Sequence, residues 1–139
     1  MSALTSDIQI PAFLIGGTAS GSGKTTLTLG ILAALKARGL TVQPFKCGPD
    51  FIDPSLHKMV TGQVSSNLDL RMCGREFCRK TFHQRLLGHD VGVVEGVMGL
   101  FDGGLSSSAA LAEALALPVV LVIDARSAAE SVAAVLKGF

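Results

Sequence analysis

Apolar residues along this chain form short runs that alternate with segments of helical spacing. The runs predict four strands, over residues 12–15, 41–46, 91–95 and 119–123. Helical spacing and capping signals predict helices over residues 24–38, 54–62, 75–87, 107–116 and 127–137. Because strands and helices alternate, we expect an α/β fold: a parallel sheet flanked by helices and joined by right-handed crossovers.

The segments between these elements carry the remaining local signals. Loops are expected over 47–54, 65–74 and 96–104, and residues 1–10 are expected to be a lead-in to a single domain over 11–139. Pro44 predicts that its strand lies at an edge or ends early, because proline has no backbone N–H to donate to a neighbouring strand. Ser127 with Glu130 fits a capping box. Four strands are few for a domain of this kind, so we expect that the sheet is truncated.

Composition narrows the class of protein. The chain has 139 residues, of which 48% are hydrophobic and 17% charged, as is typical of strands buried on both faces. A net charge of +1 gives no indication that the protein binds nucleic acid or an anionic membrane surface. The three cysteines, Cys47, Cys73 and Cys78, match no zinc spacing and favour a reduced, cytoplasmic protein. Lys46 beside Cys47 could lower the pKa of that thiol mildly.

The stretch GTASGSGKTT, residues 17–26, follows the first predicted strand and begins the first predicted helix. This context is typical of a nucleotide-binding phosphate loop. Lys24 would contact the β- and γ-phosphates and the Thr25 hydroxyl would hold Mg²⁺. The strict pattern has glycine where this chain has Thr18, with Gly17 one residue earlier. The predicted nucleotide-binding residues are Gly17, Thr18, Ser20, Gly21, Ser22, Gly23, Lys24, Thr25 and Thr26.

Two further loops follow strand ends and are rich in glycine and acids. Ligands bind beyond the carboxyl ends of parallel strands, so these loops are expected to meet the phosphate loop. Glu95 ends a buried strand and is expected to serve Mg²⁺ with Thr25. Asp50 and Asp53 are candidates for metal, substrate or proton transfer, although Asp50 could cap a turn. Lys46 could reach a phosphoryl group, with a snorkelling lysine as the alternative.

The other polar candidates are weaker. Asp102 lies between glycines and could enter the same cleft or serve as a plain turn residue. His57, His83 and His89 are expected to lie on helix or loop surfaces, show no ligand spacing and are expected to be structural. Residues 106–108, all serine, are expected to begin a helix.

Three motifs in order, GTASGSGKTT, PFKCGPDFIDP and VVEGVMGLFDG, resemble the N-terminal part of the cobyrinic acid a,c-diamide synthase family. The resemblance covers residues 12–139 and accounts for Thr18, because the family shares the Gly-Thr opening. It implies a dethiobiotin-synthetase-like P-loop domain of an ATP- and Mg²⁺-dependent carbon–nitrogen ligase. A corrin-type tetrapyrrole carboxylate would be activated as an acyl phosphate and amidated by ammonia. In the family, a C-terminal glutaminase domain, missing here, supplies that ammonia from glutamine.

The resemblance also assigns residue roles. Glu95 matches the Mg²⁺ carboxylate, and Asp50 is placed in the metal or phosphate region. Asp53 and Asp102 match positions implicated in substrate activation. Phe51 and Ile52 lie where the family shapes substrate binding, and many relatives have Tyr-Leu there.

The same three motifs leave several alternative functions open. A partition-type ATPase switch would carry a second lysine early in the loop, where this chain has Ala19. GPDFIDP argues against dethiobiotin synthetase and cobyric acid synthase but not against nickel-sirohydrochlorin a,c-diamide synthase. A cut sheet would expose a strand edge, which is expected to favour association or disorder, and a homodimer is the expected form of association.

Overall fold

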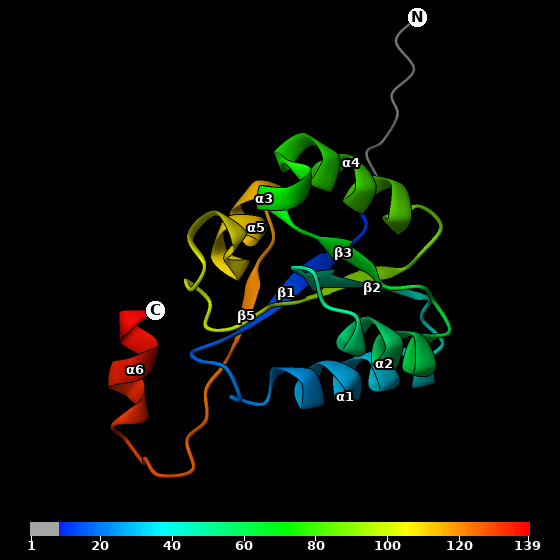
Figure 1. Cartoon of the computed structure of the whole chain (residues 1–139). Coiled ribbons are helices and arrows are strands. Elements are labelled where there is room, and N and C mark those ends of the chain that lie inside the picture. Colours follow the sequence, from blue (N-terminus) through cyan, green and yellow to red (C-terminus); the bar gives the residue numbers. More distant parts are fainter. Residues whose placement is uncertain (1–8) are drawn as a thin grey trace, which may run out of the picture.

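Five parallel strands form one sheet in the computed structural model, which describes residues 9–139 (Figure 1). The spatial order is β3-β2-β4-β1-β5. The strands are β1 (Ala12–Gly17), β2 (Val42–Cys47), β3 (Ser66–Leu68), β4 (Val91–Glu95) and β5 (Val119–Val122). The prediction of a parallel α/β sheet is therefore confirmed. The predicted lead-in lies almost entirely outside the described residues.

Helices cover both faces of the sheet. In Figure 1, α1 and α2 lie on one face, and α3, α4 and α5 lie on the other. The helices are α1 (Lys24–Ala37), α2 (Ile52–Thr61), α3 (Leu70–Cys73), α4 (Arg75–Leu86), α5 (Ser108–Leu115) and α6 (Val132–Gly138), with a 3₁₀ turn, η1, at Gly104–Ser106. α6 stands apart from the sheet, and near its end Phe139 stacks on Phe101 with ring centroids 5.4 Å apart.

Each face of the sheet has its own apolar core. Successive residues of a strand point to opposite faces, so Leu14 and Val94 pack under α4 and α5 while Ile15 and Val93 pack under α1. All four side chains are buried. The two cores explain the continuous apolar runs of the central strands.

Residues 65–74 contain a strand, β3, and a short helix, α3, where the sequence predicts a loop. β3 is the additional strand that raises the number of strands from four to five. β3 has only three residues and pairs with the end of β2, from Phe45 to Cys47. Asp69 then caps α3 by accepting hydrogen bonds from the amides of Arg71 and Met72. A strand of three residues is too short to show periodicity, which is why the sequence does not reveal it.

Pro44 does not mark an edge strand, because β2 lies between β3 and β4. β3 begins opposite Phe45, so Pro44 lies one residue before the part of β2 that pairs with β3. On its other side, Pro44 is in register with Val93 of β4. The missing amide of proline is therefore tolerated inside the sheet. The predicted edge position was wrong, because β3 is too short to pair with β2 at Pro44 and so requires no amide donor there.

Two helix starts also differ from prediction. α2 begins at Ile52 rather than Pro54, and it ends before Gly62, which has a φ of 77° as predicted for a helix stop. α6 begins at Val132, and the Ser127 capping box does not form. The helix predicted over residues 75–87 is observed as α4, and it buries Cys78, Phe82 and Leu86 against the sheet.

Candidate functional site

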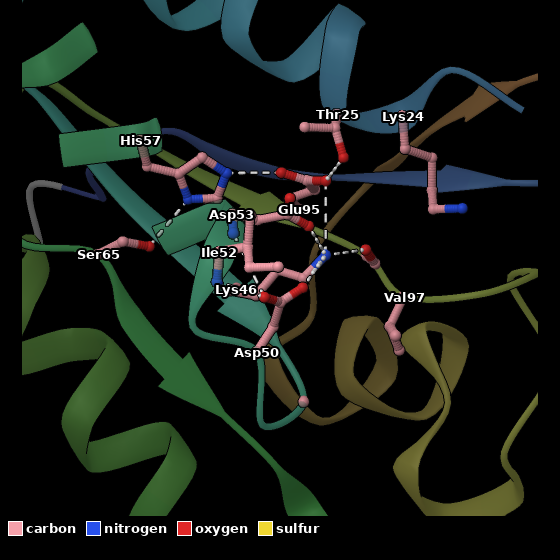
Figure 2. Close-up of polar contacts among 12 residues, drawn as sticks. Lys24, Thr25, Lys46, Asp50, Ile52, Asp53, His57, Ser65, Glu95 and Val97 are labelled. Atoms are coloured by element: carbon pink, nitrogen blue, oxygen red, sulfur yellow. Dashed lines mark hydrogen bonds and ion pairs between the residues drawn. The ribbon is translucent and has the colours of Figure 1, made fainter. Parts of the chain in front are cut away.

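The three glycine-rich loops converge because their strands are neighbours. β4 lies between β1 and β2, and Glu95 at its end is in register with Ile15 on one side and Lys46 on the other. Parallel strands end at the same edge, so the loops that follow them meet there. Figure 2 shows the side chains that gather at this edge. The predicted convergence of the loops is confirmed.

The phosphate loop explains why glycine occupies position 17. A Cβ on Gly17 would lie 2.3 Å from Ser22 Oγ and 3.0 Å from Lys24 Cγ, so a larger residue has no room. Position 18 lies outside this contact and holds threonine. Gly21 and Gly23 have φ values of 73° and 97°, which glycine adopts without strain. The displaced glycine is thus a requirement of close packing within the loop.

Lys24 and Thr25 begin α1 at the mouth of this loop. Lys24 Nζ donates a hydrogen bond to Ala19 O at 3.1 Å, across the loop. Burial and the neighbouring charge of Lys46 lower the pKa of Lys24 below its ordinary 10.5, against the opposite influence of nearby carboxylates. The Thr25 hydroxyl donates to Glu95 Oε1 at 2.6 Å. Both side chains therefore lie at the mouth of the loop, and their contacts with phosphate and metal stay predictions.

Glu95 is the centre of the site and is fully buried. Its Oε1 accepts from Thr25 and lies 3.4 Å from Lys46 Nζ, while its Oε2 lies 2.6 Å from His57 Nε2. Burial alone would raise the pKa of this carboxyl. The hydrogen bonds from His57 and Thr25 and the charge of Lys46 outweigh burial and lower the pKa below its ordinary value.

Lys46 joins the carboxylates of the second loop to Glu95. Its Nζ lies 2.7 Å from Asp53 Oδ2 and 3.8 Å from Asp50 Oδ2, and it donates to Gly96 O at 2.9 Å. The ammonium is almost completely buried. Its hydrogen-bonding capacity is engaged within the protein, so the structure gives Lys46 the position of an internal counter-ion. Its contact with a phosphoryl group stays a prediction.

Asp50 and Asp53 occupy different positions although they are close in sequence. Asp50 Oδ1 accepts from the amides of Ile52 at 2.8 Å and Asp53 at 3.3 Å, so it caps the start of α2. Asp53 sits in the first turn of α2 and faces Lys46. The capping alternative for Asp50 is therefore observed, and its role at the metal stays a prediction.

Phe51 and Ile52 border an apolar hollow beside the carboxylates. They are 84% and 74% exposed and are neighbours in the chain, so they offer adjoining apolar surface. The hollow measures about 330 Å³ and is completed by Cys47, Pro49, Asp50 and Val97. The family resemblance assigns substrate contacts to this surface, and those contacts stay a prediction.

Asp102 lies on the third loop and is exposed. Its Oδ2 accepts from the amide of Gly99 at 3.0 Å, as a turn residue would. Its charge also acts on Lys24 by raising the pKa of that ammonium. Substrate activation by Asp102 stays a prediction.

His57 was missed by sequence reasoning. It is fully buried in α2, with Nε2 against Glu95 and Nδ1 3.0 Å from Ser65 Oγ (Figure 2). The expectation that it lies on a helix surface was wrong. One signal was available: His57 follows Asp53 by four residues, which places both on one face of a helix.

The cysteines also depart from expectation at one position. Burial raises the pKa of the Cys47 thiol to about 11, although Ser108 and Lys46 act in the opposite direction. The suggestion of a lowered pKa from Lys46 alone was wrong, because desolvation of the thiolate outweighs that charge. All three cysteines are free.

The side chains at this site offer few ligands for a magnesium ion. Within residues 9–139, no group of three or more His, Cys, Asp and Glu side chains forms a metal site. Mg²⁺ in phosphate loops keeps waters and phosphate oxygens and needs few protein ligands. Thr25 beside Glu95 fits that requirement, and the buried Ser22 Oγ, which has no partner within the described part of the chain, suits a loop that receives phosphate oxygens.

The parallel sheet, the phosphate loop and the strand-end carboxylate define a P-loop nucleotide-binding protein. Residues 13–139 match the CobQ/CobB/MinD/ParA nucleotide-binding domain family, and the chain belongs to that family.

Relatives with assigned names support the predicted resemblance. The chain is 49% identical, over its whole length, to a hydrogenobyrinate a,c-diamide synthase of Streptomyces coelicolor. It is 52% identical, over 92% of its length, to a cobyrinate a,c-diamide synthase of Gloeobacter violaceus. The chain spans only 30% and 29% of these relatives. The resemblance to the a,c-diamide synthases is confirmed, and the activity of the whole protein is a separate proposal.

Across residues 9–139, no helix is both long and apolar enough to cross a bilayer.

Proposed function

We propose that this chain is the ATP-binding, carboxylate-activating part of an enzyme that amidates the a and c carboxylates of cobyrinic or hydrogenobyrinic acid. One observation carries the proposal: Thr25 of the phosphate loop and Lys46 of the second loop both contact Glu95. A nucleotide on the first loop and a carboxylate at the second would therefore be neighbours. The names of the relatives support the choice of substrate.

The reaction proceeds in two steps. A substrate carboxylate oxygen attacks the γ-phosphorus of ATP, the bond to the β–γ bridging oxygen breaks, and ADP leaves. Ammonia then attacks the acyl carbon, phosphate leaves with the carbon–oxygen electron pair, and loss of a proton gives the amide. Ammonia comes from glutamine through a glutaminase domain outside these 139 residues.

The side chains of this chain supply positioning and charge. Lys24 would neutralise the β- and γ-phosphates of a bound nucleotide, and the amides at the start of α1 would donate to them. Thr25 and Glu95 would hold Mg²⁺, which neutralises developing phosphate charge when bound. Lys46 offsets the acids near the incoming carboxylate. The hollow beside Phe51 and Ile52 would take the apolar face of the tetrapyrrole, with Asp53 and Asp102 at the reacting end.

Calorimetric titration with Mg²⁺–ATP tests the nucleotide site. We expect saturable binding by the native chain and a loss of roughly 30-fold in Lys24→Ala, because a charged hydrogen bond contributes about 2 kcal/mol. Lys58→Ala is the matched control, since Lys58 is exposed on α2. Equal affinity in both variants would remove the phosphate loop from the proposal.

Product analysis tests the reaction. The chain is incubated with Mg²⁺–ATP, ammonium chloride as the nitrogen donor and cobyrinic acid, and amides are detected by mass spectrometry. We expect ADP formation that requires the carboxylate substrate. ATP hydrolysis without it, together with ATP-driven dimerisation, would favour a partition-type switch. Faster amidation of nickel-sirohydrochlorin would reassign the substrate.

A further inference from the structure

We propose that His57 is a positioning residue that fixes the orientation of Glu95 and couples the metal side of the nucleotide site to the start of α2. The inference rests on the proposed metal role of Glu95. His57 itself is buried beneath the site and would touch neither nucleotide nor substrate.

The surroundings of His57 show that its polar atoms are used. A buried imidazole costs free energy unless its nitrogens find partners. Nε2 lies 2.6 Å from Glu95 Oε2, and Nδ1 lies 3.0 Å from Ser65 Oγ. The ionised carboxylate only accepts, so Nε2 is the donor in this pair. Ser65 fixes the ring from the opposite side and thereby directs Nε2 toward Glu95.

The two oxygens of Glu95 are divided between two functions. Oε1 faces Thr25 at 2.6 Å, on the nucleotide side. Oε2 faces His57, away from the phosphate loop (Figure 2). Rotation of the carboxylate would break the His57 bond and leave a buried oxygen unpaired. His57 therefore holds Oε1 in the orientation that a metal beside Thr25 requires, as outer ligands do in metal sites.

The same helix carries the substrate-side residues. Asp53 and His57 are four residues apart, so both point from one face of α2 toward the sheet. Asp53 reaches Glu95 indirectly, through Lys46 at 2.7 Å, and His57 reaches it directly. A change at Glu95 on metal binding is thereby linked to the first turns of α2, where Phe51 and Ile52 lie. Because coupling between sites is reciprocal, occupancy at the start of α2 changes the affinity for the metal by the same factor.

Paired substitutions separate the positioning role from simple packing. Glutamine can place its amide near Nε2 of the histidine and donate to Glu95. Asparagine is shorter and can replace only the Nδ1 side toward Ser65. The experiment compares His57→Gln, His57→Asn, Glu95→Gln and the exposed control His83→Asn with the native chain. Calorimetry measures the affinity for a non-hydrolysable ATP analogue, with Mg²⁺ and with EDTA, and circular dichroism checks folding.

The readout is the gain in affinity that Mg²⁺ provides. We expect this gain to fall by roughly 10-fold or more in His57→Asn, in the range seen for outer-shell changes at metal sites. We expect His57→Gln to stay within about 3-fold of the native chain and His83→Asn to be unchanged. Affinity in EDTA should be similar in all of them. A folded His57→Asn that keeps the native gain overturns the inference.

Two outcomes keep this inference distinct from the proposed function. If Glu95→Gln keeps the native gain, or the native chain shows none, the metal role of Glu95 fails, and this inference is overturned together with that one part of the proposed function. If Glu95→Gln loses the gain and His57→Asn does not, only the positioning role is overturned.

Hydrogen exchange on the native chain is a second measurement that needs no variant. Coupling predicts that Mg²⁺ with the nucleotide analogue slows exchange at residues 52–57 more than the analogue with EDTA does. Equal exchange in the two conditions overturns the coupling.

Discussion

Lys46 resolves an electrostatic difficulty of a site that is rich in acids and is proposed to bind an acid. Glu95, Asp53 and Asp50 would repel an incoming carboxylate if they stood alone. The ammonium of Lys46 lies between 2.7 and 3.8 Å from one oxygen of each. A single buried cation thus offsets part of the negative charge of the three carboxylates. A bound metal ion would offset the rest.

Acid titration tests the environment of Glu95. Its folded pKa is lowered from the ordinary 4.5, so its ionised form stabilises the fold fully above that value. This contribution is lost as pH falls from 4.5 through the lower folded pKa. In urea unfolding, we expect the native chain to lose stability more steeply than Glu95→Gln in that acid window. Parallel pH curves for the two proteins would contradict the lowered pKa.

At the scale of elements, α2 determines how the substrate side is arranged. The helix follows β2 after a loop of residues 48–51 and carries Ile52, Asp53 and His57 within its first six residues. Asn67 of β3 supports the same loop by donating to Gly48 O at 2.9 Å and Asp50 O at 2.7 Å. The short strand that sequence patterns did not reveal therefore helps to hold the GPDFIDP loop.

Substitution of Asp50 tests whether capping orders this loop. Asp50→Ala removes the acceptor for two amides at the start of α2, and we expect a loss of about 1 kcal/mol in the free energy of unfolding. Asp50→Asn keeps the acceptor oxygen, so we expect its free energy of unfolding to fall by only a few tenths of a kcal/mol. Chemical denaturation measures both. Equal losses would indicate that charge near Lys46, rather than capping, is what Asp50 contributes.

Motif placement was predictable at this scale, and the contacts between elements were not. The phosphate loop, the helix that follows it and the carboxylate at the end of β4 depend on local signals that lie next to one another in the chain. His57 and Asn67 act through partners 38 and 19 residues away. Hydrogen bonds over such separations leave no local pattern in a single sequence.

At the scale of the whole molecule, β5 presents one edge of the sheet. It lies last in the strand order, and Val119 and Val120 are 38% and 41% exposed. An apolar edge strand can pair with another chain because its outer backbone groups are free to form hydrogen bonds. The expected homodimer is not tested by the structure and remains a proposal that this edge supports.

Sedimentation measures that association. We expect the chain to self-associate at high concentration and Val120→Lys to shift it toward monomer, since a charge on an edge strand opposes pairing. Lys137→Ala, on the exposed α6, is the control. A monomer at all concentrations would exclude the edge as a dimer contact.

The sequence by itself determined the alternating architecture, the phosphate loop and the residues at the strand ends, because each depends on periodicity or on neighbours in the chain. Only the tertiary structure decided that β2 lies inside the sheet, that Lys46 serves as counter-ion to three carboxylates and that His57 faces Glu95. These features follow from the order of strands in space. That order is set by packing of both faces of the sheet at once, so no single segment specifies it.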